Sequence, residues 1–257
     1  MLNAGLCKIK TDIRRQFIAI ILARRNKRLK ELMDDPNCDL DLLNNTYRQF
    51  RAINTLFSNW FILYNFYLKP RMRKRGRRYS LLDIGFGGGD IPIRIAEWAA
   101  ADGFKLDVTG IDIDPRALDY VNTIQMPPNV FFRHASTGDL LDENRRFDFI
   151  INNNTIHHLT DEKLHTMMAH STKLCRGLVL FCDIERGDLA WLFFTVISKL
   201  LFRNSFASYD GRLSIQRSYT KRELQRVIPQ DWFVKRNFPY RLLLLYKPHW
   251  NKNNNEP

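Results

Sequence analysis

Residues 81–90 read LLDIGFGGGD, an apolar run around Asp83 that continues into a loop with Gly85, Gly87 and Gly89 at alternate positions. A buried strand that leads into such a loop brings the backbone to the edge of a parallel sheet. Glycines there permit a sharp turn and let a ligand approach the backbone closely. We therefore expect a cofactor site at this loop.

The segments around the loop alternate between helix and strand. A helix-like segment at 91–101 follows the glycines, and a second expected strand at 106–111 ends beside Asp112, which lies 23 residues beyond Gly89. A carboxylate at the tip of the second strand is placed to accept hydrogen bonds from both ribose hydroxyls of a nucleotide. The spacing therefore indicates a nucleotide-like cofactor.

The charges beside the glycines distinguish between cofactors. NAD-binding loops have a third glycine in the pattern GxGxxG, but Asp90 occupies that position here. A pyrophosphate would face the carboxylates of Asp83 and Asp90. S-adenosylmethionine has no phosphate and carries a sulfonium and an ammonium, which an acidic loop attracts. The loop favours S-adenosylmethionine, and an NAD enzyme stays open as an alternative.

With these features in place, the sequence resembles a class I (Rossmann-like) S-adenosylmethionine-dependent methyltransferase. LLDIGFGGGD is similar to the first motif of that family, VTGIDID to its second, and FDFIINNNTIHHL to the strand and loop around its fourth strand. The similarity is clear over about 79–183 and holds in outline elsewhere. The segments ELMDDP, CDIERGDLAW and RSYTKREL resemble bacterial small-molecule methyltransferases, including those found beside polyketide synthases.

The predicted fold is α/β: a doubly wound, mostly parallel seven-stranded sheet with helices on both faces and an antiparallel C-terminal hairpin. Strands are expected at 79–84, 106–111, 130–133, 147–151, 178–182, 232–238 and 241–246. Helix starts are indicated by Asp114 with Pro115 and by Thr220 with Glu223. The domains expected are a basic, aromatic-rich helical segment at 1–78, a methyltransferase domain at 79–250 with a substrate-side insertion at about 186–219, and a disordered tail at 251–257.

The resemblance implies a set of cofactor contacts near the carboxyl ends of the strands. They are Asp83, Gly85, Gly87, Gly89, Asp112, Ser136 and Asn153. Ser136 stands where many relatives carry an aspartate that binds the adenine amino group, and a hydroxyl accepts that bond more weakly than a carboxylate. Asn153 is expected beside the methionine part of the cofactor.

His157 and His158 are the candidate catalytic residues. Methyl transfer from a sulfonium is an in-line displacement, so the enzyme has to align the acceptor, desolvate it and remove one proton. Histidine, with an ordinary pKa of about 6.5, is a suitable base for a phenol or a similar hydroxyl. Either residue could be the base, and the alternative is that both hold the loop through hydrogen bonds. We expect no metal, because no metal-ligand pattern is recognisable.

Aromatic and aliphatic residues between 47 and 68 recur at steps of three and four, as along one helix that ends near Pro70. This stripe is expected to pack onto the sheet domain, with Trp60 and Tyr64 as candidates for the acceptor pocket. Further acceptor candidates are Arg212, Arg217 and Tyr219.

The apolar segment 189–202 is too short, and too interrupted by Lys199, to span a bilayer. It is interpreted first as a core helix, then as a pocket wall, and last as a surface for peripheral membrane contact.

The net charge of +13 indicates a further class of partner. Basic residues concentrate at 8–30 and 69–78, where they could neutralise the phosphates of RNA or of anionic lipid. A solvated linker is the simpler interpretation, and no RRM, KH or zinc-knuckle signature accompanies the charge. The four cysteines form no CxxC pair, which suits a reducing compartment and predicts a cytoplasmic protein.

Together these features predict an enzyme that methylates a small apolar or aromatic metabolite of polyketide, phenolic or lipid-like type, preferably at oxygen. An RNA methyltransferase and a non-catalytic Rossmann-like binding subunit are the alternatives. The sequence does not determine the oligomeric state.

Overall fold

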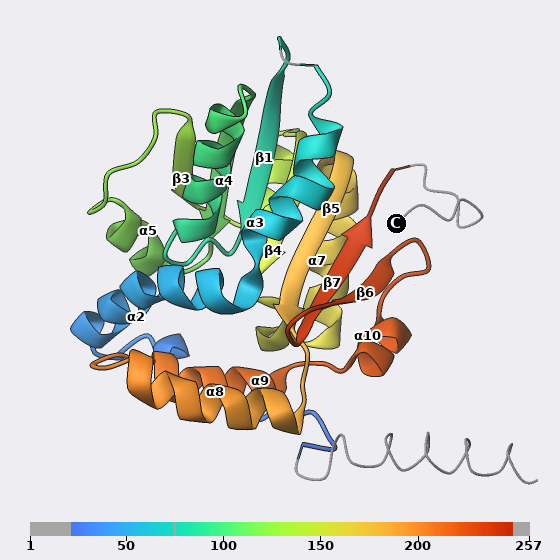
Figure 1. Ribbon diagram of the computed structural model, residues 1–257. Helices are drawn as coiled ribbons and strands as arrows, with labels where there is room; N and C mark the ends of the chain where they lie inside the picture. The colour runs from blue at the N-terminus through green and yellow to red at the C-terminus, as the bar shows by residue number, and fades with distance from the viewer. Residues whose placement is uncertain (1–21, 75, 249–257) are drawn as a thin grey trace, which may run out of the picture.

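The computed structural model describes residues 22–74 and 76–248, so the predicted tail at 251–257 and the first 21 residues lie outside the described part. A seven-stranded sheet in the order β3-β2-β1-β4-β5-β7-β6 forms its centre (Figure 1). The first five strands are parallel, and β7 runs antiparallel to both β5 and β6. The predicted mostly parallel sheet with a C-terminal hairpin is confirmed. The strands are β1 (Arg78–Ile84), β2 (Lys105–Asp112), β3 (Val130–His134), β4 (Phe147–Asn153), β5 (Cys175–Ile184), β6 (Phe233–Asn237) and β7 (Arg241–Tyr246).

Helices cover both faces of the sheet because its central strands are buried on both sides. One apolar core joins β1, β4 and β5 to α4 and to the helical turns that precede β1, and a second joins the other face to α6, α7 and α10. The helices are α2 (Leu40–Ile53), α3 (Trp60–Leu63), α4 (Asp90–Ala101), α5 (Pro115–Val121), α6 (Thr137–Asp142), α7 (Asp161–Leu174), α8 (Asp188–Leu201), α9 (Ala207–Arg217) and α10 (Lys221–Val227). Short 3-10 turns lie at η1 (Leu32–Asp34), η4 (Lys69–Arg71) and η5 (Ile156–His158).

Two helix starts follow the predicted local chemistry. Asp114 accepts a hydrogen bond from the Arg116 N–H ahead of Pro115 in α5, and Thr220 and Glu223 form a capping box at α10. These caps satisfy N–H groups that have no partner inside the helix.

The predicted single helix through the aromatic stripe is wrong. Asn59 has a left-handed φ of 52°, and it separates α2 and the π-turn η2 (Asn54–Ser58) from α3 and a second π-turn, η3 (Tyr64–Leu68). The chain turns at this point. The part before Asn59 lies across the carboxyl edge of the sheet, and the part after it packs along α4 (Figure 1).

Helices α8 and α9 lie beyond the carboxyl ends of the parallel strands, next to α2 (Figure 1). Hydrogen bonds connect them to α2: the Thr46 hydroxyl accepts from the Phe206 N–H at 2.9 Å, and the Asn45 amide donates to the Arg203 and Asn204 carbonyls. Together the three helices close the space above the glycine loop. In the described residues, each helix falls short of the length and apolar character needed to cross a membrane.

Candidate active site

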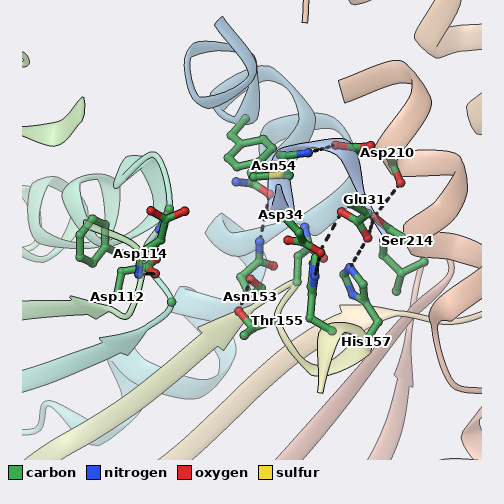
Figure 2. A pocket seen from close by; sticks show the side chains of 18 of the residues that line it. Glu31, Asp34, Asn54, Asp112, Asp114, Asn153, Thr155, His157, Asp210 and Ser214 are labelled. Carbon is green, nitrogen blue, oxygen red and sulfur yellow. Dashed lines mark hydrogen bonds and ion pairs between the residues drawn. The ribbon is translucent and has the colours of Figure 1, made fainter. Parts of the chain in front are cut away.

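A cavity of about 1060 Å³ lies between the carboxyl ends of the strands and the layer formed by α2, α8 and α9. Asp112 lies at one end of it and His157 at the other (Figure 2), and the glycine loop and His158 also line it. Sequence positions more than 70 residues apart thus share one space. This is the crevice outside the carboxyl ends of the strands where open α/β sheets bind ligands.

The glycine loop needs its glycines for two different reasons. Gly85 has a φ of 75°, and a Cβ there would lie 2.7 Å from the Thr155 hydroxyl, so the cavity floor has no room for a side chain. Gly89 also has a left-handed φ, of 72°, but it does not line the cavity. A Cβ at Gly89 would lie 2.9 Å from Phe132 and from Val121. Gly89 therefore permits close packing behind the loop, whereas Gly85 and Gly87 face the ligand space.

Asp112 is held at the end of β2 by backbone donors. Its carboxylate oxygens accept hydrogen bonds from the Gly87 and Asp114 N–H groups, each at 3.0 Å. Burial raises the pKa of Asp112, and these N–H donors oppose that rise. The loop and the acid thus fix each other, with the carboxylate in the cavity wall.

Asp83 adds a carboxyl group without a full set of hydrogen bonds to the same end of the cavity. Its side chain is 3% exposed, and Oδ1 has no hydrogen-bond partner within the described residues. Burial raises the pKa of Asp83, and the nearby Asp90 and Asp112 raise it further. Burial also raises the pKa of Asp90 to about 6. A ligand with positive charge would relieve this repulsion and would give Asp83 a partner.

Asn153 is placed in the cavity wall by three neighbours. Its Oδ1 accepts from the Trp60 indole N–H at 3.0 Å and from Arg241 at 2.9 Å, and its Nδ2 donates to Asn54 at 3.0 Å. Trp60 is 3% exposed and does not line the cavity. Trp60 therefore positions Asn153. The prediction that Trp60 itself lines the acceptor pocket is wrong. Arg241, on the antiparallel strand β7, carried no sequence signal for this role.

Ser136 lines the cavity, but its hydroxyl is already engaged. It begins α6 as the N-cap, donates to the Asp139 carboxylate at 2.9 Å and accepts from the Asp139 N–H at 3.3 Å. Asp139 is thus part of a capping box. A contact between Ser136 and adenine stays a prediction.

His157 is buried and held by a carboxylate. Its Nδ1 lies 2.7 Å from Asp183 Oδ1, and its backbone N–H donates to Asp183 Oδ2 at 3.0 Å. Its Nε2 has no hydrogen-bond partner in the described chain, but it lies 3.5 Å from Glu31 Oε1, an ion-pair contact when the ring is protonated. Burial alone lowers the pKa of His157, but Asp183 and Glu31 outweigh it and raise the pKa to about 9.

His158 is more exposed, and it contacts Asp34 in addition to Glu31, whose Oε2 lies 3.6 Å from its Nε2. Its Nδ1 lies 3.1 Å from Asp34 Oδ2, and Arg217 approaches the same oxygen at 3.2 Å. Burial raises the pKa of Asp34, but His158 and Arg217 outweigh it and lower the pKa to about 2. Arg217 thus contacts Asp34 and Glu31, the acids beside the histidines, but unlike them it does not line the cavity.

Glu31 is a buried acid that sequence reasoning missed. It is 4% exposed, accepts from the Ser214 hydroxyl at 2.9 Å, and lies 3.5 Å from Arg217 Nη1. Asp210 holds this part of the chain by accepting from the Leu32 and Met33 N–H groups. The only signal in the sequence was the acidic segment ELMDDP within a basic N-terminal region.

Glu31, His157 and His158 offer ligand atoms within 4.8 Å of one another, a grouping that could hold a metal ion. Arg217 already supplies a positive charge to Glu31 and Asp34, and it would repel a divalent cation at that position. That the protein uses no metal ion stays a prediction.

Besides Trp60 and Arg217, the other three predicted acceptor residues also lie outside the cavity wall. The Tyr64 hydroxyl donates to Asp102 at 2.7 Å within the core, Arg212 bonds the Ser208 carbonyl, and the Tyr219 hydroxyl donates to Asp161 at 2.6 Å. Each side chain is engaged elsewhere, so the prediction that these residues face the acceptor is wrong.

Apolar side chains from two separate segments line the cavity, and four of the five are aromatic. They are Phe50, Ile53 and Phe57 before the turn at Asn59, and Phe193 and Phe194 on α8. The rings of Phe57 and Phe194 contact each other edge to face at 5.8 Å. The aromatic stripe does contribute to the cavity, but through its first half rather than through Trp60 and Tyr64.

Comparisons with known proteins agree with this geometry. A family model described as a methyltransferase domain matches residues 81–177, which include the glycine loop, Asp112 and both histidines. No curated protein gives a significant sequence match.

Among solved structures, similar folds include the plantazolicin methyltransferase BpumL in complex with SAH, at 14% identity and a TM-score of 0.54, covering 84% of this chain and 92% of that chain. Human N-acetylserotonin methyltransferase in complex with SAM is 13% identical, with a TM-score of 0.54 and coverage of 80% and 55%. The PH0226 protein from Pyrococcus horikoshii OT3 is 18% identical, with a TM-score of 0.51 and coverage of 78% and 92%. At these identities the likeness is one of fold.

Proposed function

We propose that this chain, which carries a class I (Rossmann-like) methyltransferase domain, transfers the methyl group of S-adenosylmethionine to a small apolar or aromatic acceptor, at oxygen. One observation carries the proposal: a single cavity joins the acidic glycine loop to a carboxylate-held histidine through aromatic walls. Two solved structures of similar fold hold SAH or SAM, which supports the same cofactor here.

The residues present fit this cofactor at the loop end of the cavity. Asp112 is placed for the ribose hydroxyls, and the unpartnered Oδ1 of Asp83 is available to the ammonium group. S-adenosylmethionine supplies a methyl group on a positively charged sulfur. Asn153, fixed by Trp60 and Arg241, would limit the position of the methionine part.

His157 is the better candidate for the base. The short contact with Asp183 keeps the proton of a neutral imidazole on Nδ1, so the lone pair of Nε2 lies on the side of Glu31, whose Oε1 is 3.5 Å away in the cavity wall. A hydroxyl acceptor placed there would give its proton to Nε2 as the new carbon–oxygen bond forms. His158, paired with Asp34, is then a positioning residue for the acidic segment that carries Glu31.

The apolar walls of the cavity favour an apolar acceptor. Five aromatic or aliphatic side chains line it, together with polar groups that include His157. Such a space binds a flat or elongated apolar body with a hydroxyl at one end. A polyketide, phenolic or lipid-like metabolite has this form.

RNA is less well supported as the acceptor. The described residues of the basic run 69–78 lie at the start of β1, at the end of the sheet opposite α2, α8 and α9 (Figure 1). Several of its cations are paired with acids: Lys69 with Asp102, Arg77 with Asp148 and Arg78 with Asp107.

The test is product detection with a labelled donor. The purified protein is incubated with cell extract and deuterium-methyl S-adenosylmethionine, and small molecules and RNA are analysed separately by mass spectrometry. We expect S-adenosylhomocysteine to form together with a small organic product that carries the label, and His157→Ala to lose both. Label found in RNA would show that the acceptor is RNA and not a small molecule. No S-adenosylhomocysteine above the protein-free control would favour a non-catalytic binding subunit.

A further inference from the structure

Helix α8 turns its apolar side away from the protein. Five side chains at helical spacing are exposed: Leu189 by 63%, Leu192 by 56%, Phe193 by 50%, Val196 by 56% and Leu200 by 71%. On its inner side α8 buries Ala190 and Ser198 and packs Trp191 and Phe194 against the protein. The helix is thus apolar on both sides, whereas a surface helix normally exposes polar side chains on its outer side. The interpretation of this segment as a core helix is therefore wrong for its outer face.

This apolar face, Leu189, Leu192, Phe193, Val196 and Leu200, forms one continuous stripe. Their angular positions on a helix of 3.6 residues per turn fall within about 100°, a width typical of a helix face that contacts an apolar phase. Contiguous exposed apolar patches of this kind mark interaction sites. Within the described residues, no other segment covers the stripe.

Basic residues flank the stripe at both ends. Lys199 and Arg203 are exposed at its C-terminal end. At its N-terminal end the Leu22 N–H donates to Asp188 at 2.8 Å, which brings the chain carrying the exposed Arg24 close to the start of α8. Two copies facing each other through this stripe would bring cationic ends together, whereas an anionic surface would attract both ends.

The stripe is also continuous with the cavity. Phe193 is half exposed and at the same time lines the cavity, and its ring contacts Phe57 edge to face at 6.4 Å. Through Phe193, the apolar surface of α8 therefore continues into the aromatic wall of the cavity.

We propose that α8 is a docking surface for an anionic lipid bilayer. The helix lies in the plane of the interface, with its five apolar side chains among the acyl chains and Lys199, Arg203 and Arg24 at the level of the headgroup phosphates. Insertion of the stripe buries apolar area in the bilayer, and the net charge of +13 attracts the protein to the anionic headgroups.

The test is flotation of the full-length chain with two kinds of vesicle: phosphatidylcholine alone, and an equimolar mixture of phosphatidylcholine with phosphatidylglycerol. We expect the protein to float with the anionic vesicles and to be released by high salt. Leu192→Ser combined with Val196→Ser removes apolar area without touching the cavity lining, and it should lower the partition coefficient about tenfold or more. Phe131→Ser, at an equally exposed apolar residue on β3, is the matched control and should float like the unmodified protein.

Lys199→Glu with Arg203→Glu gives a second measurement that leaves the apolar stripe intact, and it should weaken binding to anionic vesicles only. Folding of each variant is checked by its thermal melt. Binding is read without turnover, so these results are separate from those on methyl transfer. Failure of the unmodified protein to float with anionic vesicles would overturn the proposal. So would equal flotation of the double serine variant, which would place the contact on another segment, or a stripe-dependent dimer that does not bind vesicles.

Discussion

Asp112 carries the clearest residue-level prediction. Asp112→Ala removes the carboxylate that is placed to accept from two ribose hydroxyls, and each charge-assisted hydrogen bond contributes about 1.5 to 3 kcal/mol. We expect affinity for S-adenosylhomocysteine to fall by at least about a hundredfold, measured by calorimetry. Asp107→Ala, on the same strand but paired with Arg78 away from the cavity, is the control and should bind normally. Unaltered affinity in Asp112→Ala would refute the assignment.

His157 and His158 make different predictions for the rate. His157→Ala should leave the affinity for S-adenosylhomocysteine near normal and lower the rate by about 10² to 10⁴, whereas His158→Ala should have a smaller effect. Because the pKa of His157 is raised to about 9, most of the imidazole is protonated at neutral pH and cannot accept a proton. The rate should therefore increase as the pH rises from 7 to 9. A rate that does not change with pH, or equal rates for the two alanine variants, would show that His157 is not the base.

At this scale the sequence identified residues that belong to a motif. Asp83, Gly85, Gly87, Asp112, Ser136, Asn153, His157 and His158 all line the cavity. Glu31, Asp183 and Arg241 escaped prediction for the roles they have here, because each reaches the site through tertiary contacts that no local pattern records. Asp183 lies 26 residues from His157 in the sequence, yet it is the partner that raises the pKa of that histidine.

Among the elements, the break at Asn59 makes a prediction about stability. A left-handed φ costs an ordinary residue about 1 to 2 kcal/mol, whereas asparagine tolerates it and glycine adopts it freely. Asn59 also donates from Nδ2 to the Phe238 carbonyl at 2.9 Å. Asn59→Gly loses only this bond, whereas Asn59→Ala loses the bond and adds backbone strain. We therefore expect the free energy of unfolding of the alanine variant to be about 1 kcal/mol lower than that of the glycine variant. Urea unfolding measures the difference, and equal stability would contradict it.

Elements with a local cause were predictable. The strands are apolar runs between turn signals, and the caps at Asp114 and Thr220 depend on residues a few positions apart. The turn at Asn59 was not predictable, because hydrophobic residues continue at helical spacing through it. The outward direction of the apolar stripe on α8 was equally hidden, since the periodicity of a helix does not say which side meets the protein.

For the molecule as a whole, the buried pair of His157 and Asp183 predicts a pH dependence of folding. The pKa of His157 is raised in the folded state to about 9 from its ordinary 6.5, so its stabilising contribution is complete below pH 6.5 and is lost as the pH rises to 9. The loss should reach up to about 3 kcal/mol, at about 1.4 kcal/mol per pKa unit. His157→Gln should reduce this decline, measured by urea unfolding at pH 6.5 and pH 9. An identical decline in the variant would show that other groups cause it.

The central claim is that the acidic glycine loop selects a positively charged methyl donor. Calorimetric titration of the unmodified protein with S-adenosylmethionine, S-adenosylhomocysteine and NADH tests it most directly. We predict saturable binding of both adenosyl compounds and no competition from NADH. Tight uptake of NADH, with no heat from either adenosyl compound, would contradict it.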